Sequence, residues 1–258
     1  PQTWRGLVER ALRVGLRHPL PAVGPLAVDV QEGRPEGDRL DLAVLAAVAA
    51  VATAEAGLIY LGRTYGSTGE ERKKRLPGDD IIPDAGVQTD HAITIEAPPS
   101  SVWPWLVQMG WGRGAWYTAR IVDRLLFPAN GPSAERIVPE LQDISIGTFI
   151  PDGPPETKTG LYVVALEPKR AMVLRSNSHL PMSWRDRATL DWTWTFVLTP
   201  VDGGRRTRYH FRSRWVTTPW WFTLSGWLGI VPADFVMSHD HLRAARMFSI
   251  SAPSNPSH

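Results

Sequence analysis

The sequence predicts an α+β fold in which an antiparallel sheet packs against a long C-terminal helix, preceded by a helical N-terminal extension. Three stretches carry this prediction. Residues 89–105 read as a strand that changes into a helix, residues 189–198 and 208–215 read as two long strands, and residues 233–250 repeat apolar side chains at helical spacing. A sheet with one apolar face needs a covering layer, which the helices supply.

Residues 89–105 have the sequence T-D-H-A-I-T-I-E-A-P-P-S-S-V-W-P-W. Side chains alternate with a period of two up to Ala97, as in a half-buried strand. Pro98 and Pro99 have no backbone N–H to donate, so the strand ends there. Val102 and Leu106 then begin a helical spacing. The stretch therefore predicts a strand followed at once by a helix.

The two long strands carry aromatic side chains at alternate positions and are joined by a turn at Asp202-Gly203-Gly204. This pattern predicts an antiparallel pair with one covered face. Alternation alone leaves open which face lines the interior, so the polar side chains of Asp191, Arg212 and Arg214 are an alternative inward set. Shorter strands are expected at residues 146–150, 161–166 and 171–176, which gives five or six strands in all.

The composition excludes several classes of site. The chain of 258 residues contains no cysteine, so disulfides, thiolate metal sites and cysteine nucleophiles are excluded. The net charge is only +2 and no long basic run with interleaved aromatics occurs, so we expect no nucleic-acid partner. Twelve tryptophans suit a wide core or an aromatic-lined pocket.

The N-terminal part offers two helices. Residues 4–17 form an amphipathic basic pattern, which we interpret as a helix packed on the main domain rather than on a membrane surface. Residues 40–62 are free of charge only from Leu42 to Ala54, which is short of a full membrane span. We favour a buried, alanine-rich helix over a marginal membrane anchor. The charged residues 70–75 are expected to form a solvated linker.

The strand–Pro-Pro–helix opening, the segment L-P-G-D-D at residues 76–80 and the segment R-I-V-P-E at residues 136–140 resemble bacterial members of the START/Bet v1-like (SRPBCC, polyketide cyclase-like) superfamily. The resemblance covers about residues 76–250. It implies a helix-grip fold, with a helical extension and linker at residues 1–75, a ligand-binding domain at 76–250 and a tail at 251–258. It also implies a hydrophobic, polyketide- or lipid-like ligand, cyclisation or dehydration of that ligand as its chemistry, and no cofactor.

In such a fold the ligand lies in a cavity between the sheet and the C-terminal helix. Polar side chains inside an apolar cavity are costly unless paired, so they are the catalytic candidates. These are Tyr117, Arg120, Asp191 and His239. The ligand-binding candidates are Trp116, Arg175, Trp192, Trp194, Phe196, Tyr209, Phe211, Trp215 and Phe235. The alternative is that the aromatic residues only fill the core and that Arg120 and Arg175 form surface salt bridges.

The sequence contains no metal-binding motif. His239 and His241 are close in sequence, but they point to opposite sides of a helix and so cannot share a metal ion. Three functions therefore stay open: an enzyme of the cyclase type, a carrier without catalysis, and a membrane-associated interaction module held weakly by its N-terminal helices. We expect a cytoplasmic protein, membrane-associated in the third case, and the oligomeric state is not specified. A paired Tyr–Arg–His set in the cavity favours the enzyme, an apolar cavity favours the carrier, and an exposed helix at residues 40–62 favours the membrane protein.

Overall fold

The computed structural model describes residues 36–117, 129–180, 182–232, 235, 238, 239, 241 and 242. The chain divides into two compact units, Pro1–Ala49 and Ala50–His258. Helix α2 (Glu36–Thr64) crosses this division, so its second half belongs to the same unit as the sheet. The helix expected at residues 4–17, the candidate Arg120 and the tail at 251–258 lie outside the described residues.

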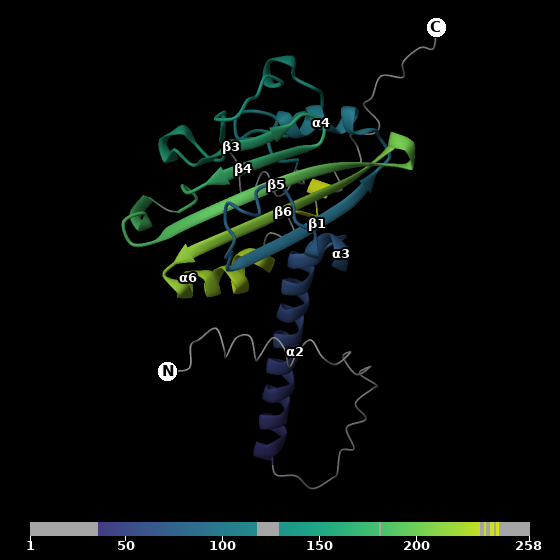
Figure 1. Cartoon of the computed structure of the whole chain (residues 1–258). Helices are drawn as coiled ribbons and strands as arrows, with labels where there is room; N and C mark the ends of the chain where they lie inside the picture. The colour runs from purple at the N-terminus through teal and green to yellow at the C-terminus, as the bar shows by residue number, and fades with distance from the viewer. Residues whose placement is uncertain are drawn as a thin grey trace. The chain divides into compact units, whose positions relative to one another are not determined.

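The second unit is built on one six-stranded antiparallel sheet, with the strands in the order β1-β6-β5-β4-β3-β2 (Figure 1). The strands are β1 (Val87–Ile95), β2 (Phe149–Pro151), β3 (Gly160–Glu167), β4 (Ala171–Ser176), β5 (Thr189–Val201) and β6 (Arg206–Thr218). The predicted α+β class and the antiparallel sheet are confirmed. The two alternating aromatic stretches are the longest strands, and they pair with each other along their whole length.

The predicted change from strand to helix is also found. Strand β1 ends before the double proline, and α4 (Pro99–Val107) begins at Pro99, where the missing N–H has no helical partner to lose. Val102 and Leu106 of α4 are fully buried and join a core cluster with Phe196 and Tyr209 of the sheet. Helix α4 therefore covers one half of a sheet face.

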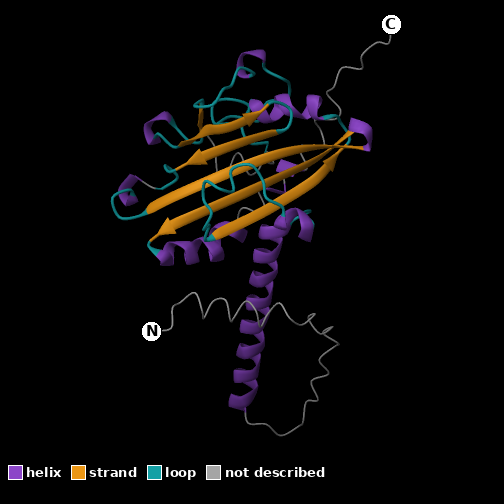
Figure 2. Cartoon of the chain, in the orientation of Figure 1, coloured by secondary structure: helices purple, strands orange, loops and turns teal. Residues whose placement is uncertain are grey.

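Short helices occupy the connections: α3 (Gly69–Lys73), η1 (Pro139–Leu141), η2 (Pro155–Thr157), η3 (Met182–Trp184), η4 (Asp202–Gly204), α6 (Trp220–Ser225) and the π-helix η5 (Gly226–Ile230). Figure 2 shows α6 at the end of β6, next to the start of β1. Beyond η5 the described residues Val231, Pro232, Phe235, Ser238, His239, His241 and Leu242 are helical. The full C-terminal helix expected at residues 233–250 is not shown, because most of these residues lie outside the described ones.

Strand register assigns each side chain to one of two faces. Ser213 of β6 pairs with Thr89 of β1 and with Trp194 of β5, so these three share what we call the inner face. The neighbouring Arg212 pairs with Asp90 and Thr195 on the opposite, outer face. The alternative that Asp191, Arg212 and Arg214 point inward is therefore wrong.

The charged stretch at residues 70–75 is mostly solvent-exposed, as expected, but it is not merely a linker, because its backbone binds the sheet. The carbonyl oxygens of Glu71, Arg72 and Lys74 accept hydrogen bonds from the guanidinium of Arg212 at 2.9–3.1 Å, and the Glu71 carboxylate pairs with Arg208. Arg212 is 2% exposed. The segment that contains α3 thus covers the outer face, because a buried guanidinium needs acceptors that the sheet alone does not supply.

Helix α2 confirms the predicted helix at residues 40–62 but not its burial. Its apolar side chains are exposed within the described residues, with Leu45 at 64%, Val51 at 70% and Tyr60 at 63%. The stretch Asp41–Thr64 has a mean hydropathy of 2.1 over a membrane-length window, none of it buried. By length and composition, this helix can cross a bilayer.

Candidate functional site

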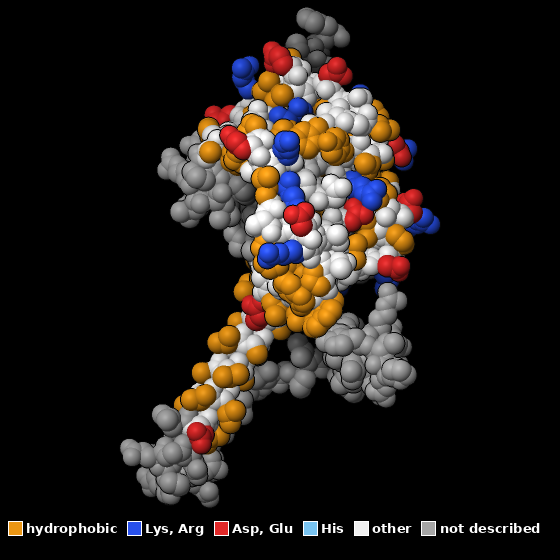
Figure 3. Space-filling model, turned by 90° about the vertical axis from the view of Figure 1, so that its left-hand side faces the viewer, with side chains coloured by type: hydrophobic (Ala, Val, Ile, Leu, Met, Phe, Trp, Pro, Cys, Tyr) orange, Lys and Arg blue, Asp and Glu red, His pale blue; other side chains and the backbone are white. Residues whose placement is uncertain are grey.

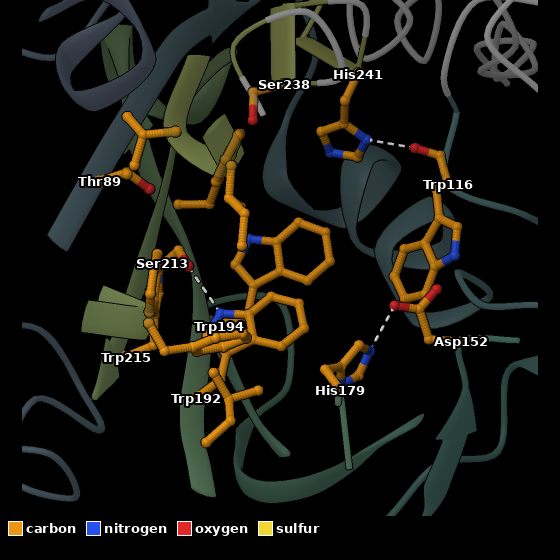
Figure 4. Close-up of a pocket in the computed structure, with 15 residues that line it drawn as sticks. Thr89, Trp116, Asp152, His179, Trp192, Trp194, Ser213, Trp215, Ser238 and His241 are labelled. Atoms are coloured by element: carbon orange, nitrogen blue, oxygen red, sulfur yellow. Dashed lines mark hydrogen bonds and ion pairs between the residues drawn. The ribbon is translucent and has the colours of Figure 1, made fainter. Parts of the chain in front are cut away.

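A cavity of about 400 Å³ lies against the inner face of β1, β5 and β6. The strands contribute Thr89, Leu190, Trp192, Trp194, Phe211, Ser213 and Trp215; Phe222, Ile230, Val231, Ser238 and His241 follow β6 in the chain, and Trp116, Asp152 and His179 come from loops. Figure 4 shows these side chains around a common open space. The volume falls within the range of small-molecule sites in proteins.

Aromatic rings form most of the wall. The indole of Trp194 stacks on that of Trp192 with ring centroids 5.5 Å apart, and it contacts Trp116 on the other side at 5.4 Å. The ring of Trp215 packs onto Gly226, where a Cβ atom would lie 2.0 Å from the ring. The wall therefore presents wide, flat apolar surfaces, which suit a planar or polycyclic ligand.

A few polar atoms interrupt this wall, and not all of them are paired. The indole N–H of Trp192 donates to Ser213 Oγ at 2.7 Å. In contrast, Thr89 Oγ1 and Trp116 Nε1 are buried without a hydrogen-bond partner among the described residues. Buried polar atoms are nearly always hydrogen-bonded, so both atoms are unusual. In Figure 4 the Thr89 oxygen points toward the open space, whereas the Trp116 nitrogen lies on the ring edge turned away from it.

His241 lies at the deep side of the cavity in a fixed tautomer. Its Nδ1–H donates to the backbone carbonyl of Trp116 at 2.8 Å, which leaves Nε2 to accept the hydroxyl proton of Tyr209 at 2.8 Å. Burial lowers the pKa of His241 to about 4. Burial also raises the pKa of Tyr209 well above its usual range. Both groups are therefore neutral at physiological pH, and their bonds hold the core rather than leave a free base.

A second polar chain lies at the opposite side of the open space from Thr89 (Figure 4). His179 Nε2 lies 2.7 Å from Asp152 Oδ2, and its Nδ1 lies 2.7 Å from Ser176 Oγ. With Nε2–H donating to the carboxylate, a neutral ring accepts the Ser176 hydroxyl proton on Nδ1. Asp152 and His179 line the cavity, whereas Ser176 lies behind them, 3% exposed. Of the two carboxylate oxygens of Asp152, Oδ1 accepts no hydrogen bond from another described residue.

Five of the sequence-derived ligand candidates lie in the cavity wall: Trp116, Trp192, Trp194, Phe211 and Trp215. Phe196 and Tyr209 share the inner face but lie deeper, fully buried under α4. Their assignment as wall residues is corrected to core residues, because α4 occupies the half of the face that they share.

The remaining candidates do not meet at the cavity. Arg175 and Asp191 form a two-bond ion pair at 2.9 and 2.7 Å on the outer face, as the salt-bridge alternative expected. The hydroxyl of Tyr117 accepts from Gln108 Nε2 at 2.7 Å, and burial raises the pKa of Tyr117 to about 12. Phe235 and His239 pack around Tyr65 instead. Arg120 lies outside the described residues, so the Tyr–Arg–His set that would favour the enzyme stays untested.

Sequence reasoning missed several residues of the wall. Thr89 and Ser213 lie at alternate strand positions, on the same face as apolar residues of their strands, so the alternation in the sequence could have placed them in the wall. Asp152 and His179 lie in loops whose positions no periodicity specifies. His241 was considered only as a metal ligand. Within the described ranges, no group of three or more His, Asp or Glu side chains has the arrangement of a metal site.

Comparison with known proteins identifies no matching family model and no matching curated protein. Solved structures are similar over part of the fold. A hypothetical protein from Helicobacter pylori has a TM-score of 0.43 at 10% identity, covering 68% of this chain and 95% of its own. Norcoclaurine synthase from Thalictrum flavum, solved with dopamine and hydroxybenzaldehyde, has a TM-score of 0.37 at 11% identity, covering 66% and 89%. CalU16 from Micromonospora echinospora has a TM-score of 0.30 at 13% identity, covering 63% and 86%. At these scores the function must be argued from the cavity itself.

Proposed function

We propose that this protein binds an apolar, ring-containing small molecule that carries at least one oxygen acceptor. The observation that carries this proposal is the cavity of about 400 Å³ with its indole wall, beside which the Thr89 hydroxyl is buried without a hydrogen-bond partner among the described residues. An oxygen of the ligand would satisfy this hydroxyl, because a buried polar atom left unpaired is costly. A polyketide or a lipid-like aromatic fits this description.

The Asp152–His179–Ser176 chain favours a second, catalytic function on the same ligand. Removal of a proton from carbon next to a carbonyl is the first step of many cyclisations and dehydrations. Asp152 Oδ1 would take this proton, while the C–H bond electrons move to the carbonyl oxygen. The hydrogen bond from His179 holds the carboxylate in place. The unpaired Thr89 hydroxyl in the wall would donate to the oxygen on which negative charge then develops.

We also infer that α2 anchors the protein in a membrane. The candidate span Asp41–Thr64 has 24 residues, which extend about 36 Å at 1.5 Å per residue, and a bilayer core needs roughly 30 Å. A long apolar helix that stays exposed in water is unfavourable, and a bilayer removes its side chains from water. The ligand-binding unit then lies at a membrane surface.

The test uses the full chain in amphipol with prodan, a neutral naphthyl ethyl ketone that fluoresces when excited by energy transfer from tryptophan. We expect saturable binding and about tenfold weaker affinity for Trp194→Leu, which removes one aromatic wall. Tyr162→Ala is the matched control, because Tyr162 is an aromatic residue on the outer face and 52% exposed. Equal affinity for all three proteins would reject the cavity as the binding site.

The same probe tests the catalytic function. Prodan carries exchangeable protons next to its ketone, so mass spectrometry in heavy water measures proton removal directly. We expect deuterium uptake by the bound ketone to fall to the buffer rate in Asp152→Asn while prodan affinity is kept. Native mass spectrometry of protein from its own host, followed by organic extraction, then identifies the natural ligand.

A further inference from the structure

An uncharged hydrophobic surface lies beside the cavity. Residues 220–230, which form α6 and η5, have the sequence W-W-F-T-L-S-G-W-L-G-I without a charged side chain. Trp220 is 62% exposed, Leu228 54% and Ile230 52%. Trp184 adds its ring to this surface, 5.7 Å from that of Trp221. Figure 3 shows hydrophobic side chains gathered at this edge of the second unit. Isolated exposed apolar residues are common, but a contiguous patch marks an interaction surface.

The C-terminal end of α2 packs directly against this surface. Gly62 approaches so closely that a Cβ atom there would lie 2.3 Å from the carbonyl oxygen of Val231. The guanidinium of Arg63 lies 4.7 Å from the ring centre of Trp227, and Ile59 packs with Val231. All of these residues belong to the second unit. The end of the candidate span and the α6–η5 surface are therefore packed against each other.

The chemistry of this junction matches the boundary between lipid and water. Tryptophan, tyrosine and arginine collect at the ends of membrane-spanning helices, where one part of the side chain is apolar and the other is hydrated. Here Tyr60 and Arg63 end the apolar helix, and Trp220 and Trp221 extend the same zone sideways. Residues 220–230 carry no charged side chain and contact the end of the candidate membrane span, and this continuity with the span favours a lipid surface as the partner of the patch.

The same elements also close the cavity. Phe222 of α6 and Ile230 of η5 line the cavity, while their neighbours Trp221 and Leu228 are exposed on the surface. Among the described residues, α6 and η5 thus contribute side chains both to the cavity wall and to the patch. A route along these two elements would let a ligand that dissolves in the bilayer reach the cavity without crossing water.

We propose that α6 and η5 lie in the interfacial layer of a lipid bilayer and that the cavity exchanges its ligand with that bilayer. The surface rests on its own observations, whereas the exchange rests on the proposed ligand-binding function. The ligand class is thereby narrowed to molecules that partition into lipid, with an apolar ring system and a polar end.

The absence of cysteine from the chain makes the surface directly testable. The full chain carries one introduced cysteine, at Trp220→Cys, Leu228→Cys or the control Arg170→Cys, and is spin-labelled and reconstituted into phosphatidylcholine vesicles. Arg170 lies in the β3–β4 turn with its side chain 78% exposed. We expect labels at 220 and 228 to collide several-fold less with a water-soluble nickel chelate than the label at 170, and more with oxygen.

Equal nickel collisions at all three positions would place the surface in water and overturn the proposal. Protection from both reagents, with dipolar broadening between labels on two copies, would show that a second copy covers the patch, which also overturns it. Because these measurements contain no ligand, their outcome is independent of prodan binding.

Ligand exchange has a separate test. The double variant Trp220→Asp/Leu228→Asp changes residues that do not line the cavity, so its prodan affinity in amphipol should equal that of the unmodified chain. In vesicles loaded with prodan we expect energy transfer to the protein to develop several-fold more slowly. An unchanged rate would overturn the exchange route. Loss of prodan binding by the unmodified chain in amphipol would instead reject the proposed function and leave the surface standing.

Discussion

Adjacent residues of β6 point to opposite faces of the sheet, and the two faces differ in how they treat buried polar atoms. On the outer face Arg212 donates to Asp90 at 2.7 Å, to Asp79 at 2.6 Å and to three backbone carbonyls. Two outer atoms without a hydrogen bond, Asp79 Oδ1 and Arg214 Nε, still form an ion pair at 3.8 Å.

The inner face keeps polar atoms that have no such pairing. Thr89 Oγ1 and His91 Nδ1 of β1 are buried without a hydrogen bond from the described residues, and Thr89 lines the cavity. The outer face therefore pairs its buried charges, whereas the inner face keeps unsatisfied polar atoms, which is the expected pattern of a ligand site.

Acid should separate the two faces with the largest effect. Burial lowers the pKa of His91 and of His241, both on the inner side, to about 4 from an ordinary 6.5. The contribution of these two histidines to the free energy of unfolding is complete above about pH 6.5. It is lost as pH falls from about 6.5 to about 4, because in this range the unfolded chain binds protons that the folded chain does not. Each pKa shift corresponds to about 3 kcal/mol of stability.

The outer carboxylates respond in a lower window. The hydrogen bond from Arg208 lowers the pKa of Glu71 to about 2, so its contribution is lost only as pH falls below about 4.5. Urea unfolding followed by circular dichroism across this range measures both windows. We expect His241→Gln to reduce the pH dependence of the free energy of unfolding between about pH 4 and pH 6.5 by the equivalent of about one proton. Stability that stays constant down to pH 4.5 would contradict the assignment of the two histidines.

Removal of the Arg212 guanidinium, which joins the carboxylates and carbonyls of the outer face, should have the next largest effect on stability. Arg212→Met removes the guanidinium from the buried Asp90 and Asp79, which keep only their weaker donors, and we expect a loss of about 3–5 kcal/mol in the free energy of unfolding. Arg175→Met is the matched control, because its ion pair lies on the same face but is 46% exposed at the arginine, and it should cost less than about 1 kcal/mol. Prodan affinity of the folded protein should not change in either variant.

A matched pair of threonines gives the smallest and sharpest test. Thr89 and Thr195 are both 2% exposed, but the hydroxyl of Thr195 donates to the carbonyl of Pro77 at 3.1 Å on the outer face. We expect Thr195→Val to cost about 1 kcal/mol, while Thr89→Val is neutral or slightly stabilising because no bond is lost. Equal costs, measured by urea unfolding, would show that Thr89 is paired in solution. Thr89→Val should also weaken prodan binding.

Local patterns in the sequence were sufficient for the sheet and for the sharing of faces. Side chains alternate along a strand whatever lies around it, so the parity of Trp192 and Trp194, and of Phe211 and Trp215, was readable at once. The double proline likewise ended β1 at the observed place, since proline removes a backbone donor in any context. The α+β class follows from these local rules.

Tertiary structure alone decided which face is the interior and which polar groups meet there. Alternation is symmetric between faces, and only the packing of α4 and of the α3 segment separates an inner from an outer side. Asp152 and His179 are 27 residues apart, and His241 bonds a carbonyl 125 residues away. Such contacts depend on loop paths, which local propensity does not specify. The exposure of α2 could not be predicted either, because an apolar helix has the same sequence pattern whether protein or lipid surrounds it.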